Sequence, residues 1–179
     1  MINSALLLRL FEKLKSQGSL FVLSESLTGG LISSEFSKIP GASAVLWGGF
    51  VVYSPYAKLN LLKISEEIIQ TYGVVSKECA LEMAKGALKT SYIKGRPFPS
   101  YSLAVTGLAG PATKYDLEEV GTVCVAVAQI TKLFSKDLTI LTDSYISSFS
   151  EVFHFEGDRD SIREETLNKG IELLLSVLA

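Results

Sequence analysis

The stretch SLFVLSESLTGGLISSEFSKI, residues 19–39, decides the fold of this chain. Residues 19–24 form a short apolar run that is typical of a buried strand. A Thr-Gly-Gly turn follows, and residues 31–39 have helical spacing and end before Pro40. A strand that turns directly into a helix predicts an α/β architecture.

The same alternation continues along the chain. Leucine and phenylalanine at helical spacing predict a first helix that ends near Gly18. Further helices are expected at 65–72, 76–92 and 159–178, and further strands at 48–54, 102–107, 120–130, 138–142 and 147–155. The last two strands form either an antiparallel hairpin or an extension of the sheet edge. We expect one domain, residues 1–179, folded as a three-layer α/β/α sandwich on a mixed, mostly parallel sheet.

Composition excludes several classes of protein. The net charge is −2 and the basic residues are scattered, so no track for nucleic acid is expected. No apolar run reaches the roughly 18 residues that span a bilayer, and charged residues interrupt the apolar N-terminus, which favours a surface helix over a signal peptide. Cys79 and Cys124 give neither a disulfide framework nor a metal site. We expect a cytoplasmic protein that uses no metal and no cofactor.

Two glycine-containing loops follow predicted strands. In ESLTGG, residues 25–30, the glycines let backbone N–H groups approach an anionic ligand at a helix start, although a tight turn explains them equally well. In VTGLAGP, residues 105–111, Thr106 offers a hydroxyl, while loop dihedral angles alone explain Gly107 and Gly110. Because ligands bind at the carboxyl edge of α/β sheets, the two loops together favour a site there.

The segment PGASAVLWGGFVVYSPYAK, residues 40–58, holds a serine, a tyrosine and a lysine with no histidine nearby. Ser43 precedes the predicted strand, whereas Tyr53 and Lys58 lie at its end, so the three meet only if the preceding loop folds back. A serine activated by lysine needs no histidine, and the one histidine, His154, lies far downstream. Lys58 is then the expected base. The alternative is a surface serine, a half-buried tyrosine and a solvated lysine.

The segment FEGDRDSIR, residues 155–163, places Arg159 at the start of the last predicted helix. A guanidinium there could hold a phosphate or carboxylate through two hydrogen bonds. Asp158 and Asp160 could equally make it part of a local ion pair. The sequence leaves both readings open.

Taken together, these motifs resemble one family. ESLTGG, PGASA with GGFVVYSPYAK, YGVVS, AVTGLAGP with VGTV, and EGDRD are similar in order and spacing to the CinA C-terminal domain family. The resemblance implies a nicotinamide-nucleotide amidohydrolase, which converts nicotinamide mononucleotide to nicotinate mononucleotide and ammonia. It also implies a three-layer α/β/α fold and a homodimer. The expected ligand is a small nucleotide substrate.

The same resemblance assigns roles to residues. It implies that Ser43 is the nucleophile, assisted by Tyr53 and Lys58. A neutral lysine is required, so burial must lower the pKa of Lys58 toward the working pH. The residues expected at the substrate are Ser26, Thr28, Gly29, Gly30, Thr106, Gly107, Gly110 and Arg159. Backbone N–H groups of the glycine loops are the expected oxyanion donors.

The chain departs from the family pattern at several positions. Leu27 stands where cysteine is usual, and Ala42 stands where a second serine is usual. The loop after Pro111 reads ATKYDLEEVGTV, without further glycines or a lysine-proline pair, and it carries Asp116, Glu118 and Glu119; the stretch 131–150 is also longer. These changes keep two other functions open: a nucleotide-binding or regulatory domain without turnover, and an amidase for another carboxamide.

Overall fold

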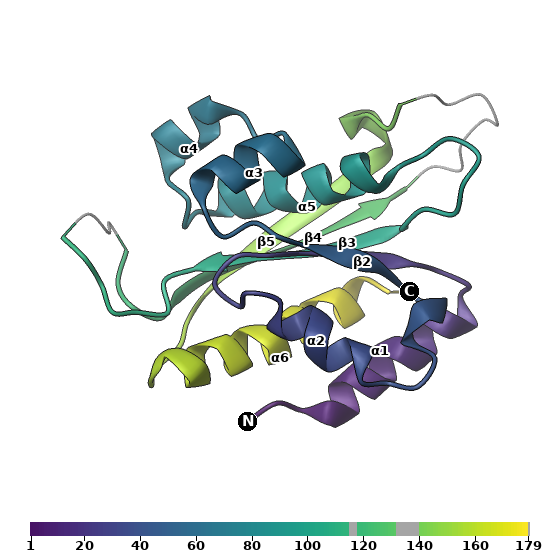
Figure 1. The fold of residues 1–179 in the computed structure, drawn as a ribbon, viewed down its shortest axis with the longest axis horizontal. Helices are drawn as coiled ribbons and strands as arrows, with labels where there is room; N and C mark the ends of the chain where they lie inside the picture. Colours follow the sequence, from purple (N-terminus) through teal and green to yellow (C-terminus); the bar gives the residue numbers. More distant parts are fainter. Residues whose placement is uncertain (115–117, 132–139, 179) are drawn as a thin grey trace.

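The computed structural model confirms the predicted α/β architecture, built on one five-stranded sheet (Figure 1). It describes residues 1–114, 118–131 and 140–178. In chain order the elements are α1 (Ser4–Ser16), β1 (Phe21–Glu25), α2 (Leu31–Ser37), the 3-10 turn η1 (Ala42–Ala44), β2 (Leu46–Val51), α3 (Pro55–Leu62), α4 (Glu66–Tyr72), α5 (Lys77–Ser91), β3 (Tyr101–Gly107), β4 (Thr122–Ile130), the 3-10 turn η2 (Asp143–Tyr145), β5 (Ile146–His154) and α6 (Arg159–Val177).

The sheet is mixed, with strand order β2-β1-β3-β4-β5. Strand β1 pairs in parallel with both β2 and β3, and β4 pairs antiparallel with both β3 and β5. Strand β4 therefore runs against the other four, which confirms a mostly parallel sheet. Because β1, β2 and β3 point the same way, their carboxyl ends share one edge, the edge where α/β proteins bind ligands.

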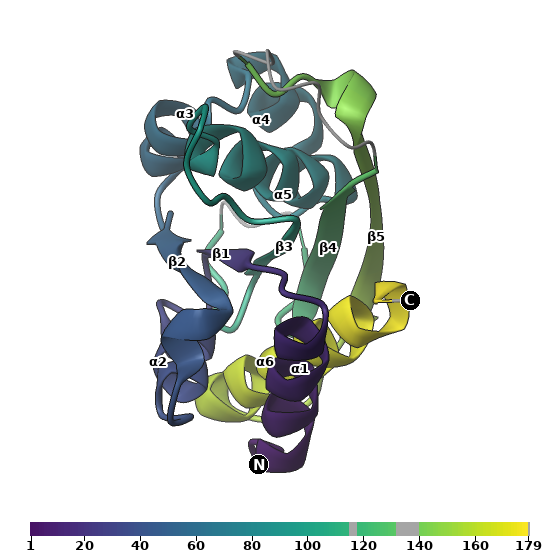
Figure 2. The same ribbon diagram turned by 90° about the vertical axis from the view of Figure 1, so that its right-hand side faces the viewer.

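Helices cover both faces of the sheet, which gives the three layers (Figures 1 and 2). Helices α1, α2 and α6 lie on one face, and α3, α4 and α5 lie on the other. Each face has its own apolar core, one centred on Phe21, Leu23 and Phe36, the other on Val22, Met83 and Ala104. Alternate residues of β1 thus serve opposite cores, as the period of a strand requires.

Serine and aspartate side chains start the helices as predicted. Ser65 and Ser76 accept hydrogen bonds from backbone N–H groups at the starts of α4 and α5, and Asp158 does the same for α6. Helix α3 was not predicted, although Ser54 caps it and Pro55 occupies its first turn. That missed helix carries Lys58.

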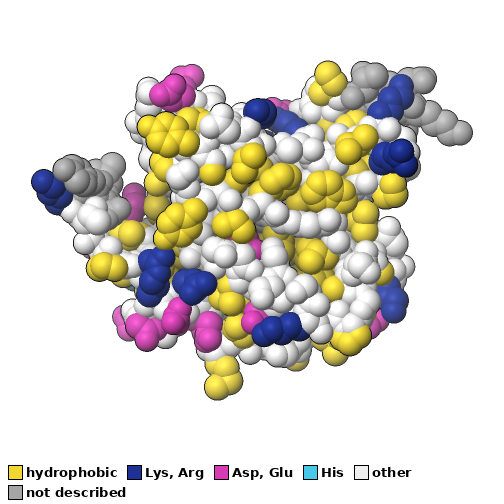
Figure 3. Space-filling view, in the orientation of Figure 1, with side chains coloured by type: hydrophobic (Ala, Val, Ile, Leu, Met, Phe, Trp, Pro, Cys, Tyr) yellow, Lys and Arg dark blue, Asp and Glu magenta, His cyan; other side chains and the backbone are white. Residues whose placement is uncertain are grey.

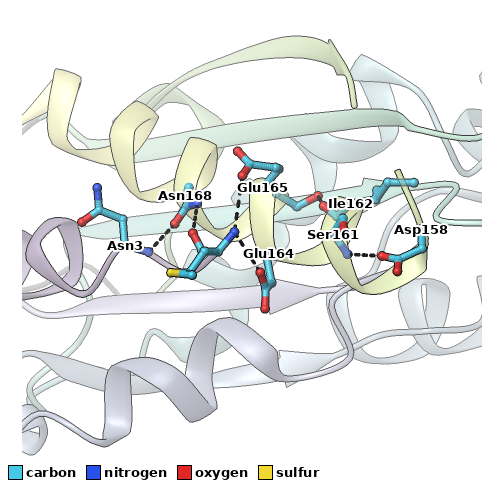
Figure 4. A network of polar contacts seen from close by, with 9 residues as sticks. Asn3, Asp158, Ser161, Ile162, Glu164, Glu165 and Asn168 are labelled. Carbon is cyan, nitrogen blue, oxygen red and sulfur yellow. Dashed lines mark hydrogen bonds and ion pairs between the residues drawn. The ribbon is translucent and has the colours of Figure 1, made fainter. Parts of the chain in front are cut away.

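The first residues of the chain are bound to α6 through hydrogen bonds and an ion pair (Figure 4). The Met1 amine lies 3.0 Å from the Glu164 carboxylate, and the Asn3 N–H donates to the side chain of Asn168. The Asn168 side chain in turn donates to the Met1 carbonyl. These contacts add to the packing of α1 against α6.

The predicted strand 138–142 differs from the structure. Its first two residues lie outside the described residues, and residues 140–142 are not in a strand. The other predicted strand, 147–155, corresponds to β5, which extends the sheet by pairing along its whole length with β4. Of the two alternatives, the edge extension is therefore the one observed.

Two expectations from composition can be checked on the described residues. Cys79 and Cys124 are both free and buried, as expected of small hydrophobic side chains. Among the helices of the described ranges, none is long and apolar enough to cross a membrane.

Candidate functional site

With the exception of Ser43, the expected site residues lie near the carboxyl edge of β1, β2 and β3. Ser26 directly follows β1, and its N–H donates to the carbonyl of Val105 in β3. Tyr53 follows β2, and α3 then carries Lys58 back over the edge. The close approach of α3 to α5 depends on Gly86, since a Cβ there would lie 2.4 Å from the Leu62 carbonyl oxygen.

Lys58 is a fully buried lysine that contacts a serine. Its side chain is 1% exposed, and its Nζ lies 2.9 Å from Ser26 Oγ and 2.8 Å from the Val52 carbonyl oxygen. Burial lowers the pKa of the Lys58 amine, and the nearby Cys79 opposes this shift. Burial also raises the pKa of the Cys79 thiol to about 11, so this thiol is neutral near pH 7 and its opposing effect is small there.

No carboxylate balances the Lys58 charge within the described part of the chain, because no ion pair of 4.0 Å or less reaches its Nζ. Desolvation by burial favours the neutral form of this amine, and no nearby carboxylate compensates for the lost hydration of the charged form. This environment is the one that the expected base requires.

Ser43 does not join Lys58 within this chain. It is exposed on η1, which precedes β2, whereas Lys58 follows β2. Six strand residues separate the two ends, a length of roughly 20 Å at about 3.3 Å per residue. Figure 1 shows η1 at the right-hand end of the sheet and α3 at the left. Ser43 instead lines an open depression of about 550 Å³ with Lys38, Pro40 and Trp47.

The ESLTGG loop is organised around the buried carboxylate of Glu25. Its oxygens accept hydrogen bonds from the N–H groups of Gly30, Ile32 and Ser33 and from the hydroxyls of Thr28 and Ser33. The Gly29 N–H donates to the Ser26 carbonyl. The glycine N–H groups that were expected to face a ligand therefore already have partners within the protein.

Arg159 connects the ends of three elements. Its guanidinium donates to the Tyr53 hydroxyl at 2.7 Å and to the Gly110 carbonyl. The alternative reading, an ion pair of Arg159 with Asp158 or Asp160, is not observed: Asp160 lies 2.8 Å from Arg163, which also donates to the Thr28 carbonyl. Arg159 itself has no ion pair among the described residues.

The β3 end of the site is tightly fixed. The buried Thr106 hydroxyl donates to the Val74 carbonyl at 2.7 Å, so it holds the YGVVS segment against the sheet. A Cβ at Gly107 would lie 2.7 Å from the Thr122 carbonyl oxygen, which excludes larger residues there. Asp116 of the altered loop lies outside the described residues, while Glu118 and Glu119 are exposed.

Within the described ranges, no group of three or more His, Cys, Asp or Glu side chains is arranged to hold a metal ion. Figure 3 shows basic and acidic side chains gathered at the edge where α6 begins, below an apolar surface over α3 and α4. The functional groups of the site are the Ser26 hydroxyl, the buried Lys58 amine, the Tyr53 phenol and the guanidinium groups of Arg159 and Arg163. Together these groups can attack a carbonyl and bind an anion.

Sequence reasoning missed two residues of the site, Glu25 and Arg163. Arg163 lies four positions after Arg159 in α6, a spacing that places both on one helix face. Glu25 ends a buried strand one residue before Ser26. Its role was hidden because its partners are nearby backbone N–H groups and hydroxyls, so no oppositely charged residue in the sequence points to it.

Comparisons with known proteins agree with these motifs. Residues 3–178 match the family model described as the CinA C-terminal domain. A CinA-like protein of Fervidobacterium nodosum is 36% identical over 164 residues, which cover 92% of this chain and 35% of that protein. A CinA-like protein of Chloroherpeton thalassium is 37% identical over 167 residues, which cover 91% of this chain and 36% of that protein. The chain thus spans about a third of the length of these relatives.

Solved structures show the same fold. The competence/damage inducible protein CihA from Agrobacterium tumefaciens has a TM-score of 0.81 and 29% identity, covering 98% of this chain and 97% of that one. A CinA superfamily protein from Escherichia coli has a TM-score of 0.81 and 26% identity, and the match covers 96% of this chain and 88% of that one. With a family match over nearly its whole length, this chain belongs to the CinA C-terminal domain family.

Proposed function

We propose that this chain hydrolyses the carboxamide of nicotinamide mononucleotide, with Ser26 as nucleophile and Lys58 as general base. The observation that carries the proposal is the 2.9 Å contact between Lys58 Nζ and Ser26 Oγ at a buried position. Membership of the family supports the substrate, and the serine–lysine geometry supports the reaction type. Ser26 thus takes the role that the sequence assigned to Ser43, because Ser26 is the serine within reach of the base.

The reaction proceeds through an acyl-enzyme. Neutral Lys58 accepts the proton of the Ser26 hydroxyl while keeping its hydrogen bond to the Val52 carbonyl. The serine oxygen bonds to the carboxamide carbon, and the proton on Lys58 passes to the departing nitrogen, which leaves as ammonia. Water, deprotonated by Lys58, then attacks the ester carbon; nicotinate mononucleotide leaves and Ser26 recovers its proton.

The developing oxyanion needs N–H donors near Ser26. In the described loop from Ser26 to Ser33, the backbone N–H groups of Leu27 and Thr28 are the ones to which no hydrogen bond is assigned. They directly follow the nucleophile, so they are the donors we assign to this role. Gly29 and Gly30 serve to shape the turn, since both have positive φ angles of 61° and 96°.

The phosphate end of the substrate is assigned to Arg159. Two of its donors hold Tyr53 and Gly110, and a guanidinium has five N–H groups in all, so three remain. Thr106 and Gly107 support this end indirectly by fixing the β3 loop. This arrangement fits a ligand with a neutral amide at one end and an anion at the other.

The deciding experiment is ammonia release from nicotinamide mononucleotide by the purified protein and by two serine variants. We expect Ser26→Ala to lose roughly 10³-fold or more in turnover, as nucleophile variants do. Ser43→Ala is the matched control and should keep its activity. Loss of activity in Ser43→Ala with an active Ser26→Ala would return the nucleophile to Ser43.

A binding domain without turnover is the second candidate, motivated by the altered loop with exposed Glu118 and Glu119. Acidic side chains are poor neighbours for a phosphate. Calorimetric binding of the mononucleotide without ammonia release would establish that function instead. Ammonia release from other carboxamides, without preference for a phosphorylated one, would point to a different amidase.

A further inference from the structure

We infer that Glu25 is a positioning residue, whose carboxylate holds the loop that presents Ser26 to Lys58. The kinetic part of this inference rests on the proposed function, whereas the structural part does not. Glu25 is completely buried and immediately precedes Ser26. It does not contact Lys58 through an ion pair in the described structure, so it acts through the loop.

Five hydrogen bonds converge on the Glu25 carboxylate. One oxygen accepts from the Thr28 hydroxyl at 2.8 Å, the Gly30 N–H at 3.0 Å and the Ile32 N–H at 3.1 Å. The other accepts from the N–H of Ser33 at 2.8 Å and its hydroxyl at 2.6 Å. Both oxygens act as acceptors only, which is the hydrogen-bonding role of an ionised carboxylate.

The position of Ser26 follows from the alternation of the strand. Glu25 points to the face that carries α2, and the next residue therefore points to the face that carries α3 and α5. Lys58 meets Ser26 on that second face. A shift of the Glu25 side chain would move the shared backbone and hence the hydroxyl on the other side of the sheet.

A second contact holds the same loop from outside. Arg163 of α6 donates to the Thr28 carbonyl at 3.0 Å, while the Thr28 hydroxyl donates inward to Glu25. The loop is therefore fixed from both sides between the sheet and α6. Successive N–H groups in such a turn can bind an anion, and here the chain's own carboxylate fills that place. The substrate phosphate must then bind elsewhere.

The kinetic test compares Glu25→Gln with Glu35→Gln, a matched substitution in the same helix-turn segment. Glu35 pairs with Lys38 at the far end of α2 and should leave kinetics unchanged. A glutamine at position 25 presents an NH2 group to N–H and O–H donors, so the loop must shift. We expect kcat to fall by about 100-fold, the cost of a small misplacement, with KM and the midpoint of the pH profile nearly unchanged.

Other outcomes would overturn the inference. A shift of the pH midpoint to lower pH would mean that Glu25 acts electrostatically on Lys58 rather than by position. A loss of activity that only follows the fraction of unfolded protein would mean a structural role alone. Unchanged kcat in Glu25→Gln would overturn the kinetic part of the inference.

A second measurement needs no activity. In Glu25→Ala, formate can occupy the place of the carboxylate, so formate should raise the thermal midpoint of this variant in a saturable way. Chloride at equal ionic strength should not, and neither wild type nor Glu35→Ala should respond to formate. If wild type releases no ammonia, the proposed function fails while this assay still decides the role of Glu25. Absence of a formate effect, together with an unchanged thermal midpoint in Glu25→Gln, would overturn the structural part.

Discussion

The Tyr53 hydroxyl accepts a 2.7 Å hydrogen bond from Arg159, although 106 positions separate the two residues. The same guanidinium donates to the Gly110 carbonyl, so it joins the ends of β2, β3 and α6. Arg159 is held by neutral partners rather than by carboxylates. Its positive charge therefore remains available to an anion, which distinguishes it from Arg163 and its partner Asp160.

Arg159→Ala should chiefly raise KM for the mononucleotide. A hydrogen bond to a charged group contributes about 1.5–3 kcal/mol, which corresponds to roughly a 10- to 150-fold loss of affinity. KM for the dephosphorylated nucleoside should change much less, and Arg9→Ala on α1 serves as a control. Equal effects on nucleotide and nucleoside would show that Arg159 only connects loops.

Tyr53→Phe tests whether the phenol positions Arg159 through its hydrogen bond or takes part in the chemical step. Tyr53 is 59% exposed, so its hydrogen bond contributes at most about 1 kcal/mol, and KM should rise by less than about 10-fold with kcat maintained. A double-mutant cycle with Arg159→Ala should show that the two effects are coupled. A large fall in kcat at unchanged KM would instead mean that Tyr53 assists the chemical step, the role that the family resemblance implied.

Much of the fold could be predicted because its signals are local. The strand–turn–helix of residues 19–39 and the caps Ser65, Ser76 and Asp158 all appear as expected. Helix α3 was missed because its sequence, PYAKLNLL, follows a predicted strand directly and its serine–proline start was not recognised. The strand also ends at Val51, earlier than predicted, because the chain turns into that helix.

The site was only partly predictable, for a geometric reason. Ser43 is close to Lys58 in sequence but lies at the opposite end of β2. Ser26 is far from Lys58 in sequence, yet it follows a parallel strand and so reaches the same sheet edge. The rule that parallel strands share their carboxyl edge could have identified this pair. The hydrogen bonds of Glu25 could not be predicted, because they depend on the loop conformation.

Lys58→Arg tests whether the site needs a base or a positive charge. Arginine stays protonated in proteins and cannot accept the Ser26 proton, so we expect almost no turnover although the charge is kept. Lys58→Met should be similarly inactive. Both are measured by ammonia release, with thermal midpoints to confirm folding. Substantial activity with arginine would mean that the proton leaves Ser26 by another route.

The pH dependence of activity should follow the ionisation of Lys58. Burial lowers the pKa of this amine below its usual value of 10.5, and only the neutral amine can accept a proton. The value of kcat/KM should therefore rise with pH along one ionisation whose midpoint lies below 10.5. A profile with no such ionisation anywhere below pH 10.5 would contradict this role for Lys58.

The free energy of unfolding should also depend on pH through Lys58, and it should increase as the pH rises. Between the lowered pKa and 10.5, the unfolded chain binds a proton on Lys58 that the folded chain does not, so the free energy of unfolding rises with pH. The slope contributed by one such group is at most about 1.4 kcal/mol per pH unit. Lys58→Met lacks this group, so wild type should gain stability relative to the variant as pH rises through that window. Urea unfolding of both proteins at several pH values measures the difference. Parallel curves would mean that Lys58 keeps the same protonation in the folded and unfolded states, and the neutral-amine mechanism would then lose its physical basis.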